Sequence, residues 1–242
     1  MDGNGRWADK HGKSRQFGHE QGSSNVYDIF LSCIELDINT ATFFAMSSEN
    51  MKRPKEETEF ISILLDKSIK KYLPDLLGNQ IKFNVIGDIS HLPENIKNTI
   101  DHAESVTSLF TKYKLNIAYN YGGQWDVVNS INTLLNKKLV ISHENLSKYL
   151  STGSDFPDLI VRTGGYKRLS NFMLWQAAYS ELIFLDILWP EFSSKDVSNI
   201  LNNYKSIIRN SYLDGIKYES PNSGISESIF AHISGVKLGG KS

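Results

Sequence analysis

The sequence lacks several features that mark common classes of protein. It contains one cysteine, Cys33, which excludes a disulfide within the chain and is typical of a reducing compartment. Its 26 basic and 27 acidic side chains leave a formal net charge of −1. Because neither sign is in excess, nothing global indicates a nucleic-acid or membrane-surface partner, and any anion-binding site must be local.

Long apolar runs are also missing. The most apolar segment in the C-terminal part of the sequence is LIFLDILW (182–189). It is much shorter than the ~20 residues of a membrane-spanning helix, and it carries Asp186. No signal peptide precedes the opening motif. We therefore expect a cytoplasmic protein, with any membrane contact made from the cytosolic face without a crossing.

Helical and strand-like segments alternate along the chain. Periodicity predicts helices at 19–38, 55–77, 93–112, 125–138, 143–151, 170–179 and 194–208, and strands at 40–47, 81–87, 115–121, 158–164 and 182–187. This alternation predicts an α/β fold with a central, mainly parallel sheet flanked by helices. No linker divides the chain, so we expect one domain at 1–209 and an irregular tail at 210–242. In the helix at 93–112, the aligned residues are Ile96, Ile100, Ala103, Val106 and Phe110.

The opening stretch, MDGNGRWADKHGKSRQFGHEQG (1–22), combines glycines with charged groups. Glycines let backbone N–H groups approach an anion, and Arg6 adds bidentate contacts to phosphate oxygens. The carboxylate of Asp2 would repel a phosphate unless a cation such as Mg²⁺ bridged them. Arg15 and His19 follow, with His19 just before a predicted helix whose N-terminus favours anions. The alternative is a solvated tail, which the density of special residues argues against.

Two further polar segments follow predicted strands, where ligands of α/β folds collect. In SSENMKRP (47–54), helix capping is the simpler interpretation, although the guanidinium group of Arg53 could also bind a phosphate. In RTGGYKRLSNF (162–172), two arginines, a lysine and a helix beginning at Ser170 predict an anion pocket; a solvated basic loop is equally open. Glu181 is expected at the surface or as a metal ligand.

The remaining motifs exclude other chemistries. His11, His91, His102, His143 and His232 have no metal-ligand spacing. No Ser-His-Asp order can be assigned, and no GxxxxGK[ST] loop occurs. Basic residues are not interleaved with aromatics, so we expect no nucleic-acid partner.

Taken together, the motifs resemble those of the cis-prenyltransferases. The matching segments are MDGNGRWA, RxxGHxxG from Arg15 to Gly22, SSEN with a nearby Arg-Pro, NYGGQWD (120–126), RTGG…RLSNFxLWQ (162–176), YSEL and LWPEF (188–192). They run in order over roughly four-fifths of the chain, which is far more specific than a lone glycine pattern.

The resemblance implies repeated, Mg²⁺-dependent condensation of isopentenyl diphosphate with an allylic diphosphate such as farnesyl diphosphate. The product would be a Z-polyprenyl diphosphate, a lipid-carrier precursor. The allylic diphosphate would be held by Gly3, Asn4, Gly5, Arg6, Arg15 and His19. Isopentenyl diphosphate would be held by Arg162, Arg168, Leu169 and Ser170. Further substrate contacts would come from Trp7, Ser47, Ser48, Glu49, Met51 and Arg53.

The same resemblance assigns roles in the chemistry. Asp2 would be catalytic and bind Mg²⁺, and Glu181 would be a further metal ligand, offered from the side of a partner subunit. Asn50 stands at the position proposed as proton acceptor; because an amide is a poor base, we expect it to position the proton or a water. The family implies a homodimer, an apolar tunnel for the growing chain, and peripheral membrane contact through the lipid product. Segments 26–34, 42–46 and 60–77 would line such a tunnel or form ordinary core.

The sequence also departs from the family pattern. Met51 replaces a common tryptophan, and Tyr166 a common acid. The family has a buried strand before its Met-Asp-Gly-Asn motif, where this sequence begins, so we expect Asp2 to lie on a frayed, mobile end. The segment after about 209 lacks the family's basic, glycine-ended pattern. These departures leave a second hypothesis open, a non-catalytic subunit that stabilises a catalytic partner.

Overall fold

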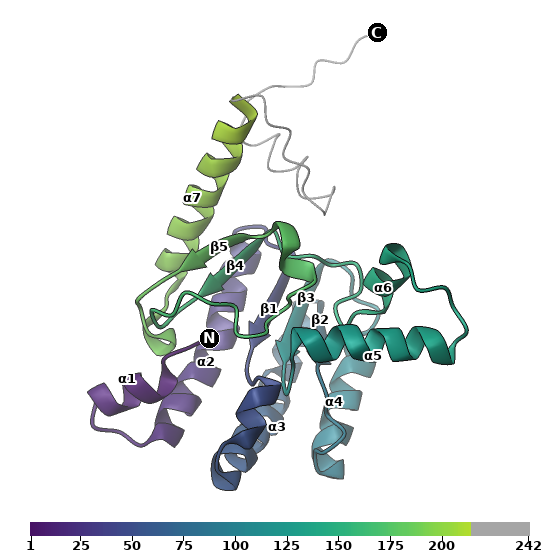
Figure 1. Ribbon diagram of the computed structural model, residues 1–242. Coiled ribbons are helices and arrows are strands. Elements are labelled where there is room, and N and C mark those ends of the chain that lie inside the picture. The colour runs from purple at the N-terminus through teal and green to yellow at the C-terminus, as the bar shows by residue number, and fades with distance from the viewer. Residues whose placement is uncertain (214–242) are drawn as a thin grey trace.

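The computed structural model describes residues 1–213, with side chains as far as Ser206. Figure 1 shows an α/β fold whose last helix projects away from the body. The helices are α1 (Asn4–Lys10), α2 (Arg15–Glu35), α3 (Lys55–Gly78), α4 (Glu94–Thr107), α5 (Gly123–Asn136), α6 (His143–Tyr149) and α7 (Ser194–Leu213). The strands are β1 (Thr40–Phe44), β2 (Ile81–Ile86), β3 (Tyr113–Ala118), β4 (Leu159–Arg162) and β5 (Glu181–Phe184). Three 3₁₀ helices are η1 (Ser48–Lys52), η2 (Gln176–Tyr179) and η3 (Trp189–Glu191).

All five strands pair in parallel, as predicted, and they form two sheets. The larger sheet has the order β1-β3-β2, and the smaller consists of β4 and β5. The two sheets share no strand-to-strand ladder. Side chains and loops must therefore fix the position of one sheet against the other.

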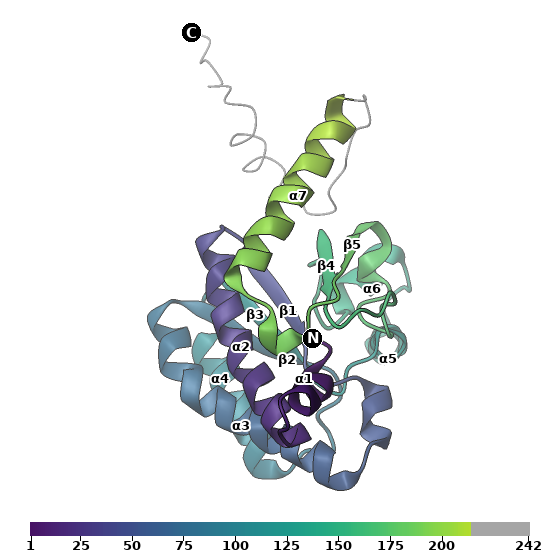
Figure 2. The same cartoon turned by 90° about the vertical axis from the view of Figure 1, so that its left-hand side faces the viewer.

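The faces of the three-stranded sheet differ in polarity because side chains alternate along a strand. Phe43, Phe83, Leu115 and Ile117 belong to the buried core, together with residues of α2, α3 and α4. Figure 2 shows these three helices on one side of the sheet and β4 and β5 on the other. Intervening positions carry a hydrogen-bonded row of Thr42, Asn116 and Asn84.

Several predicted helices have different ends in the structure. The helix predicted at 19–38 begins at Arg15, where the Ser14 side chain accepts a hydrogen bond from the N–H of Phe17. His19 therefore lies in the second turn, and the prediction of a helix N-terminus beside it is wrong. Helix α7 continues to Leu213, past the predicted domain end at 209, and the rest of the predicted tail lies outside the described residues. Helix α1 was not predicted.

The predicted buried face of α4 is also partly wrong. Val106 is 39% exposed, whereas Thr107 is fully buried. The Thr107 hydroxyl donates to the carbonyl of Ala103 and accepts from the N–H of Phe83 on the edge strand β2. A polar side chain can occupy the core here because both of its hydrogen-bonding capacities are used.

The helix predicted at 170–179 is mostly absent. Only Gln176–Tyr179 is helical, as η2. Ser170, Asn171 and Met173 instead adopt left-handed backbone conformations, with φ of 50°, 62° and 45°. Because a right-handed helix cannot include such residues, Ser170 does not begin a helix, and the predicted helix N-terminus at this anion pocket is wrong.

Helix α1 packs closely on α2 through a glycine. A methyl group added at Gly18 would lie 2.2 Å from the backbone oxygen of Asn4 and 3.0 Å from the Cβ of Ala8. We expect Gly18→Ala to lower the free energy of unfolding by about 1–3 kcal/mol, because backbone atoms must move. Thermal unfolding measures this, with Gly78→Ala as the control, since nothing lies within 4 Å of a methyl group there. Equal melting temperatures for the two variants would refute the packing argument.

Candidate functional site

Asp2 is held firmly at the carboxyl end of β4. Its N–H donates to the Thr163 hydroxyl at 3.0 Å, and its carbonyl accepts from that hydroxyl and from the N–H of Trp189, each at 3.0 Å. Figures 1 and 2 place the N-terminus beside the β4–β5 sheet. The expectation of a frayed Asp2 is therefore wrong, because hydrogen bonds to the segments after β4 and β5 anchor its backbone.

The carboxylate of Asp2 lies between two arginines predicted to bind phosphates. Its Oδ2 is 2.9 Å from Nη2 of Arg162, and its Oδ1 is 3.4 Å from Nη2 of Arg6. Arg6 also donates to the carbonyl of Gly164 at 2.8 Å. Gly164 has a φ of 85°, and a methyl group there would lie 2.6 Å from Nη2 of Arg6. The close approach of α1 to the loop after β4 therefore requires glycine.

Arg162 also organises the loop predicted to hold the second anion. Its Nη1 donates to the Ser170 hydroxyl at 2.7 Å and also to the carbonyl of Arg168. The turn around Leu169 closes with a hydrogen bond from the N–H of Phe172 to its carbonyl, at 3.1 Å. The four residues predicted for this pocket are thus brought together, with a left-handed turn in place of the predicted helix.

The side chain of Tyr166 lies among three guanidinium groups. Its ring centroid is 4.4 Å from Cζ of Arg168, 5.0 Å from that of Arg6 and 5.7 Å from that of Arg162. These distances are within the range of cation–π attraction, about 0.5–1 kcal/mol per pair at exposed sites. The ring attracts the three cations without the charge that an acid at this position would add.

Glu57, which belongs to none of the predicted motifs, contacts three of the predicted substrate-binding residues, two arginines and a histidine. Its Oε1 is 3.1 Å from Arg15, 3.2 Å from the ring of His19 and 2.8 Å from Arg53. Burial lowers the pKa of His19, against the opposing effect of Glu57. Burial tends to raise the pKa of Glu57, but Arg53 and Arg15 hold it below its ordinary value. The i,i+4 spacing of Arg53 and Glu57 was the one feature of the sequence that could have indicated an ion pair involving Glu57.

The first residue of the SSEN segment, Ser47, is the N-cap of η1, and the other three belong to η1 itself. The Ser47 hydroxyl accepts from the N–H of Asn50 at 3.3 Å, so the capping interpretation of this motif is confirmed. The N–H of Ser48 donates to the carbonyl of Tyr121, and the Met51 side chain packs against the core. Trp7, on α1, stacks on Phe17 with ring centroids 6.1 Å apart.

Glu181 does not lie beside Asp2 within one chain. It is the first residue of β5 and pairs with Leu159, whereas Phe184 pairs with Arg162 at the carboxyl end. Three residues along a strand span about 10 Å. Within the described part of the chain, no cluster of three or more His, Cys, Asp or Glu residues could hold a metal ion.

A cavity lies between α2, α3 and the larger sheet, and His19 joins it to a polar cluster of Asp2, Arg6, Arg15, His19, Glu57, Arg162 and Ser170. It contains about 850 Å³ of unfilled space, with its open mouth included. Met1, Asn4 and His19 line one end, and the rest is lined mainly by apolar side chains of α2, α3 and the sheet. The Asn4 side-chain oxygen is buried without a hydrogen-bond partner among the described residues. Because buried polar atoms are rarely left unpaired, this oxygen points to a ligand or water.

Known proteins share both the sequence and this arrangement. Residues 1–211 match the family model described as a putative undecaprenyl diphosphate synthase. The chain is 42% identical over 212 residues to the ditrans,polycis-undecaprenyl-diphosphate synthase ((2E,6E)-farnesyl-diphosphate specific) of Buchnera aphidicola from Schizaphis graminum, covering 84% of this chain and 85% of the relative. It is 39% identical over 205 residues to an isoprenyl transferase of Fusobacterium nucleatum, covering 84% and 89%. The chain belongs to the cis-prenyltransferase family.

Solved structures agree with this assignment. A lavandulyl diphosphate synthase from Lavandula x intermedia, in complex with dimethylallyl diphosphate, matches with a TM-score of 0.79 and 30% identity, covering 84% of this chain and 92% of that one. A probable undecaprenyl diphosphate synthase from Campylobacter jejuni matches with a TM-score of 0.71 and 32% identity, covering 76% and 88%. The cis-prenyltransferase described here is thus a prenyl-transferring enzyme with the fold that its motifs implied.

One acid of the prenyltransferase has a structural role that the sequence did not reveal. Asp126, from the NYGGQWD motif, is 1% exposed. Its Oδ2 accepts from the Tyr121 hydroxyl at 2.9 Å and from Gln176 at 3.0 Å. Its Oδ1 accepts from the N–H of Ser151 at 2.9 Å and from the Ser151 hydroxyl at 2.7 Å. Asp126 therefore joins the loop after β3 to two distant segments.

The prenyltransferase has no described helix that is both long and apolar enough to cross a bilayer.

Proposed function

We propose that this prenyltransferase condenses isopentenyl diphosphate with an allylic diphosphate, such as farnesyl diphosphate, to give a Z-polyprenyl diphosphate. The observation that carries the proposal is the cavity with one polar end and an otherwise apolar lining. A ligand that fits it has a charged head and a hydrocarbon tail. We propose that the apolar part holds the growing chain, as the predicted tunnel. Segments 26–34, 42–46 and 60–77, for which the sequence left tunnel lining and ordinary core open, all contribute residues to this lining.

The polar cluster supports two diphosphate sites. Gly3, Asn4, Gly5 and Arg6, together with Arg15 and His19, would hold the allylic diphosphate. Arg162, Arg168, Leu169 and Ser170 would hold isopentenyl diphosphate. In support of this division, Arg15 and His19 meet at Glu57, whereas Arg162 and Ser170 are directly hydrogen-bonded. Met51, Arg53, Trp7 and Ser47–Glu49 would make the remaining contacts.

The site suits Mg²⁺, which proteins usually bind through one or two carboxylates plus substrate phosphates and waters. Asp2 offers such a carboxylate, since its side chain is 34% exposed and its contact with Arg6 is long at 3.4 Å. Glu181 is too far along β5 to join Asp2 in the same subunit, so its role as a metal ligand would require a partner subunit. When bound, the metal would stabilise the charge that develops on the departing diphosphate.

The chain's own residues would carry the rest of the reaction. Arg6 and Arg15 would stabilise the leaving allylic diphosphate as its bond to carbon breaks. Arg162, Arg168 and Ser170 would orient isopentenyl diphosphate for attack on the allylic carbon. Asn50 would position the departing proton or a water that accepts it.

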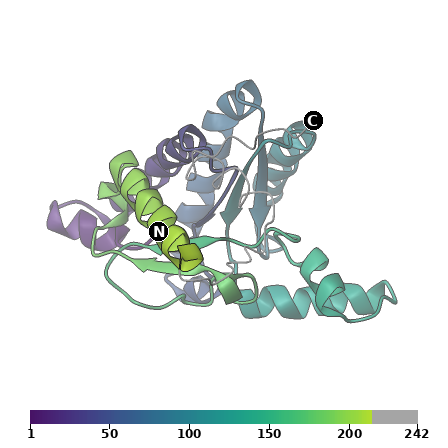
Figure 3. The ribbon, with the colours of Figure 1, turned by 90° about the horizontal axis from the view of Figure 1, so that it is seen from above.

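We further propose a homodimer. Large apolar side chains are exposed on α5 and the segment after it, namely Val128, Leu135, Leu139, Val140 and Ile141. In Figure 3, α5 and α6 extend from the side of the molecule opposite α1. Several large exposed apolar side chains in one region of the chain favour association, here with a second copy. Membrane contact would come through the lipid product.

The test is incorporation of labelled isopentenyl diphosphate with farnesyl diphosphate, in Mg²⁺ and in EDTA. We expect an extended polyprenyl product in Mg²⁺ alone. Equal product in EDTA would refute the metal assignment. No product under either condition, on protein with a cooperative unfolding transition, would favour the non-catalytic subunit that stabilises a partner.

A further inference from the structure

Asn171 connects loops that follow three different strands. Its Nδ2 donates to Oε1 of Glu49, in the loop after β1, at 2.7 Å. Its Oδ1 accepts from the N–H of Gln124, at the start of α5 after β3, at 3.0 Å. Its backbone carbonyl accepts from the N–H of Gly123 at 2.6 Å. One residue thus ties the segment after β4 to the loops that follow β1 and β3 in the larger sheet.

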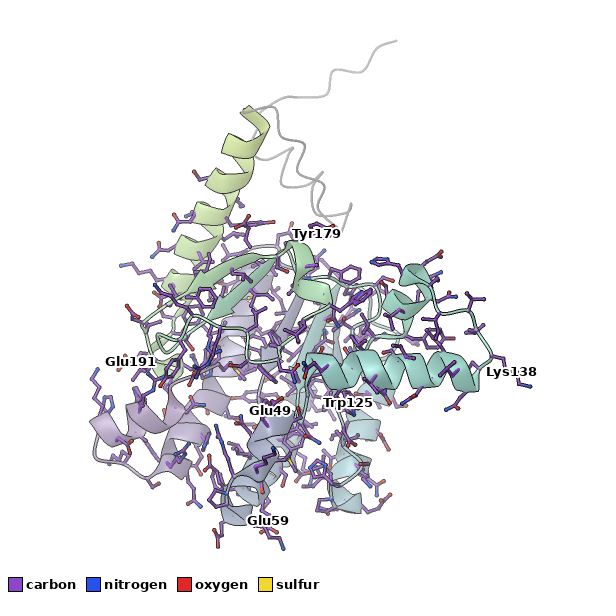
Figure 4. All side chains as sticks on the ribbon, viewed as in Figure 1. Glu49, Glu59, Trp125, Lys138, Tyr179 and Glu191 are labelled. Carbon is purple, nitrogen blue, oxygen red and sulfur yellow. The ribbon has the colours of Figure 1, made fainter. Side chains whose placement is uncertain are left out.

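These contacts lie where the two sheets have no ladder between them. Glu49 belongs to the loop after β1, whereas the Arg162–Ser170 pair belongs to β4 and its following loop. Figure 4 shows Glu49 beneath the beginning of α5, where Trp125 is labelled. The hydrogen bonds of Asn171 therefore join the Glu49 loop to the loop that carries Ser170.

The backbone and the charge at this point fit the bridge. Asn171 has a φ of 62°, which asparagine adopts more readily than most residues, and it directly follows Ser170. A methyl group at Gly122 would lie 2.7 Å from Nδ2 of Asn171, so the chain is closely packed around the amide. Partial burial raises the pKa of Glu49, but hydrogen bonds, with that from Asn171 the largest, hold it below its ordinary value. Glu49 therefore faces Asn171 as a carboxylate.

We propose that Asn171 is a positioning residue that sets the separation of the two diphosphate pockets. The proposal rests on the proposed function, in which Arg15 and His19 hold the allylic diphosphate and the Arg162–Ser170 loop holds isopentenyl diphosphate. The Glu49 loop belongs to the allylic side, because Arg53 at its end meets Arg15 and His19 at Glu57. Condensation requires the two reacting carbons to meet at a defined distance, and misplacement by about 1 Å costs about 100-fold in rate. Asn171 acts on this distance without contacting either substrate.

Asn171→Asp tests the bridge directly. It retains the acceptor for Gln124 but replaces the amide donor with a carboxylate facing Glu49. We expect kcat to fall about 10- to 100-fold, while the Kd of each diphosphate alone changes less than about threefold. Asn171→Gly, which keeps the left-handed backbone and removes the side chain, should behave similarly. Equal losses in both affinities with kcat unchanged would overturn the positioning role.

Reversing the pair gives the sharper test. Combining Glu49→Gln with Asn171→Asp places an amide donor at position 49 opposite a carboxylate at position 171. We expect this double variant to have a higher kcat than Asn171→Asp alone, and higher than the product of the two single effects predicts. Effects that simply multiply would show that the two side chains do not act together, and would overturn the proposal.

Amide hydrogen exchange separates failure of this proposal from failure of the proposed function, because it needs no turnover. In Asn171→Gly we expect faster exchange at Gly123 and Gln124 and in the segment 48–53, even if the enzyme makes no polyprenyl product. Unchanged exchange in those segments would mean that Asn171 does not hold the loops together, whatever the enzyme's substrates. Unchanged exchange would therefore overturn the bridge itself.

Discussion

Asp2→Ala is expected to abolish product formation while the protein stays folded. Loss of the carboxylate removes the proposed metal ligand and should lower kcat by at least about 100- to 1,000-fold. Folding should persist, because the anchoring hydrogen bonds use the backbone N–H and carbonyl of residue 2. Incorporation of labelled isopentenyl diphosphate and thermal unfolding measure the two effects.

Asp9→Ala is the matched control for Asp2→Ala. Asp9 lies on α1, shortly after Asp2 in the chain, and is exposed. It should retain near-normal turnover. Diphosphate binding by Asp2→Ala should be kept or tightened, since Arg162 and Arg6 lose a competing anion. Turnover by Asp2→Ala within threefold of the unaltered enzyme would refute the assignment of Asp2 as metal ligand.

Asp126→Ala is expected to have the largest effect on stability. It would leave the Tyr121 hydroxyl, the Gln176 amide and the Ser151 donors buried without their acceptor. A buried donor left without its acceptor typically costs about 1–3 kcal/mol, and Asp126→Ala leaves several such donors unpaired. For a chain of this size each kcal/mol lowers Tm by about 2–4 °C, so calorimetry should detect the change readily.

Asp101→Ala, at an exposed position on α4, is the control for this experiment. It removes an acid without breaking a buried network, so its Tm should stay close to that of the unaltered chain. If Asp126→Ala melted at the same temperature as Asp101→Ala, the network would contribute nothing measurable, and a direct role in substrate binding would become the better interpretation of Asp126.

Local patterns accounted for most of the secondary structure. Helical periodicity predicted α3 closely, and β-branched and aromatic runs predicted strands such as β1 and β2. The errors arose where a local rule competed with a tertiary contact. Thr107 is buried because the edge strand β2 supplies it with a backbone N–H, and no periodicity of apolar residues can reveal that. The left-handed turn at Ser170 and Asn171 is likewise held by contacts with distant residues.

By itself, the sequence determined the family, the chemical character of the polar motifs and the alternation of helices and strands, because all three depend on residue identity and short-range spacing. Only the tertiary structure decided that Asp2 is anchored through Thr163 and Trp189, that Glu57 contacts two arginines and His19, and that Asn171 joins the loops after β1, β3 and β4. Apart from Arg53 and Glu57, these contacts join residues far apart in the chain. Their geometry follows from how the two parallel sheets lie against each other, which no local pattern specifies.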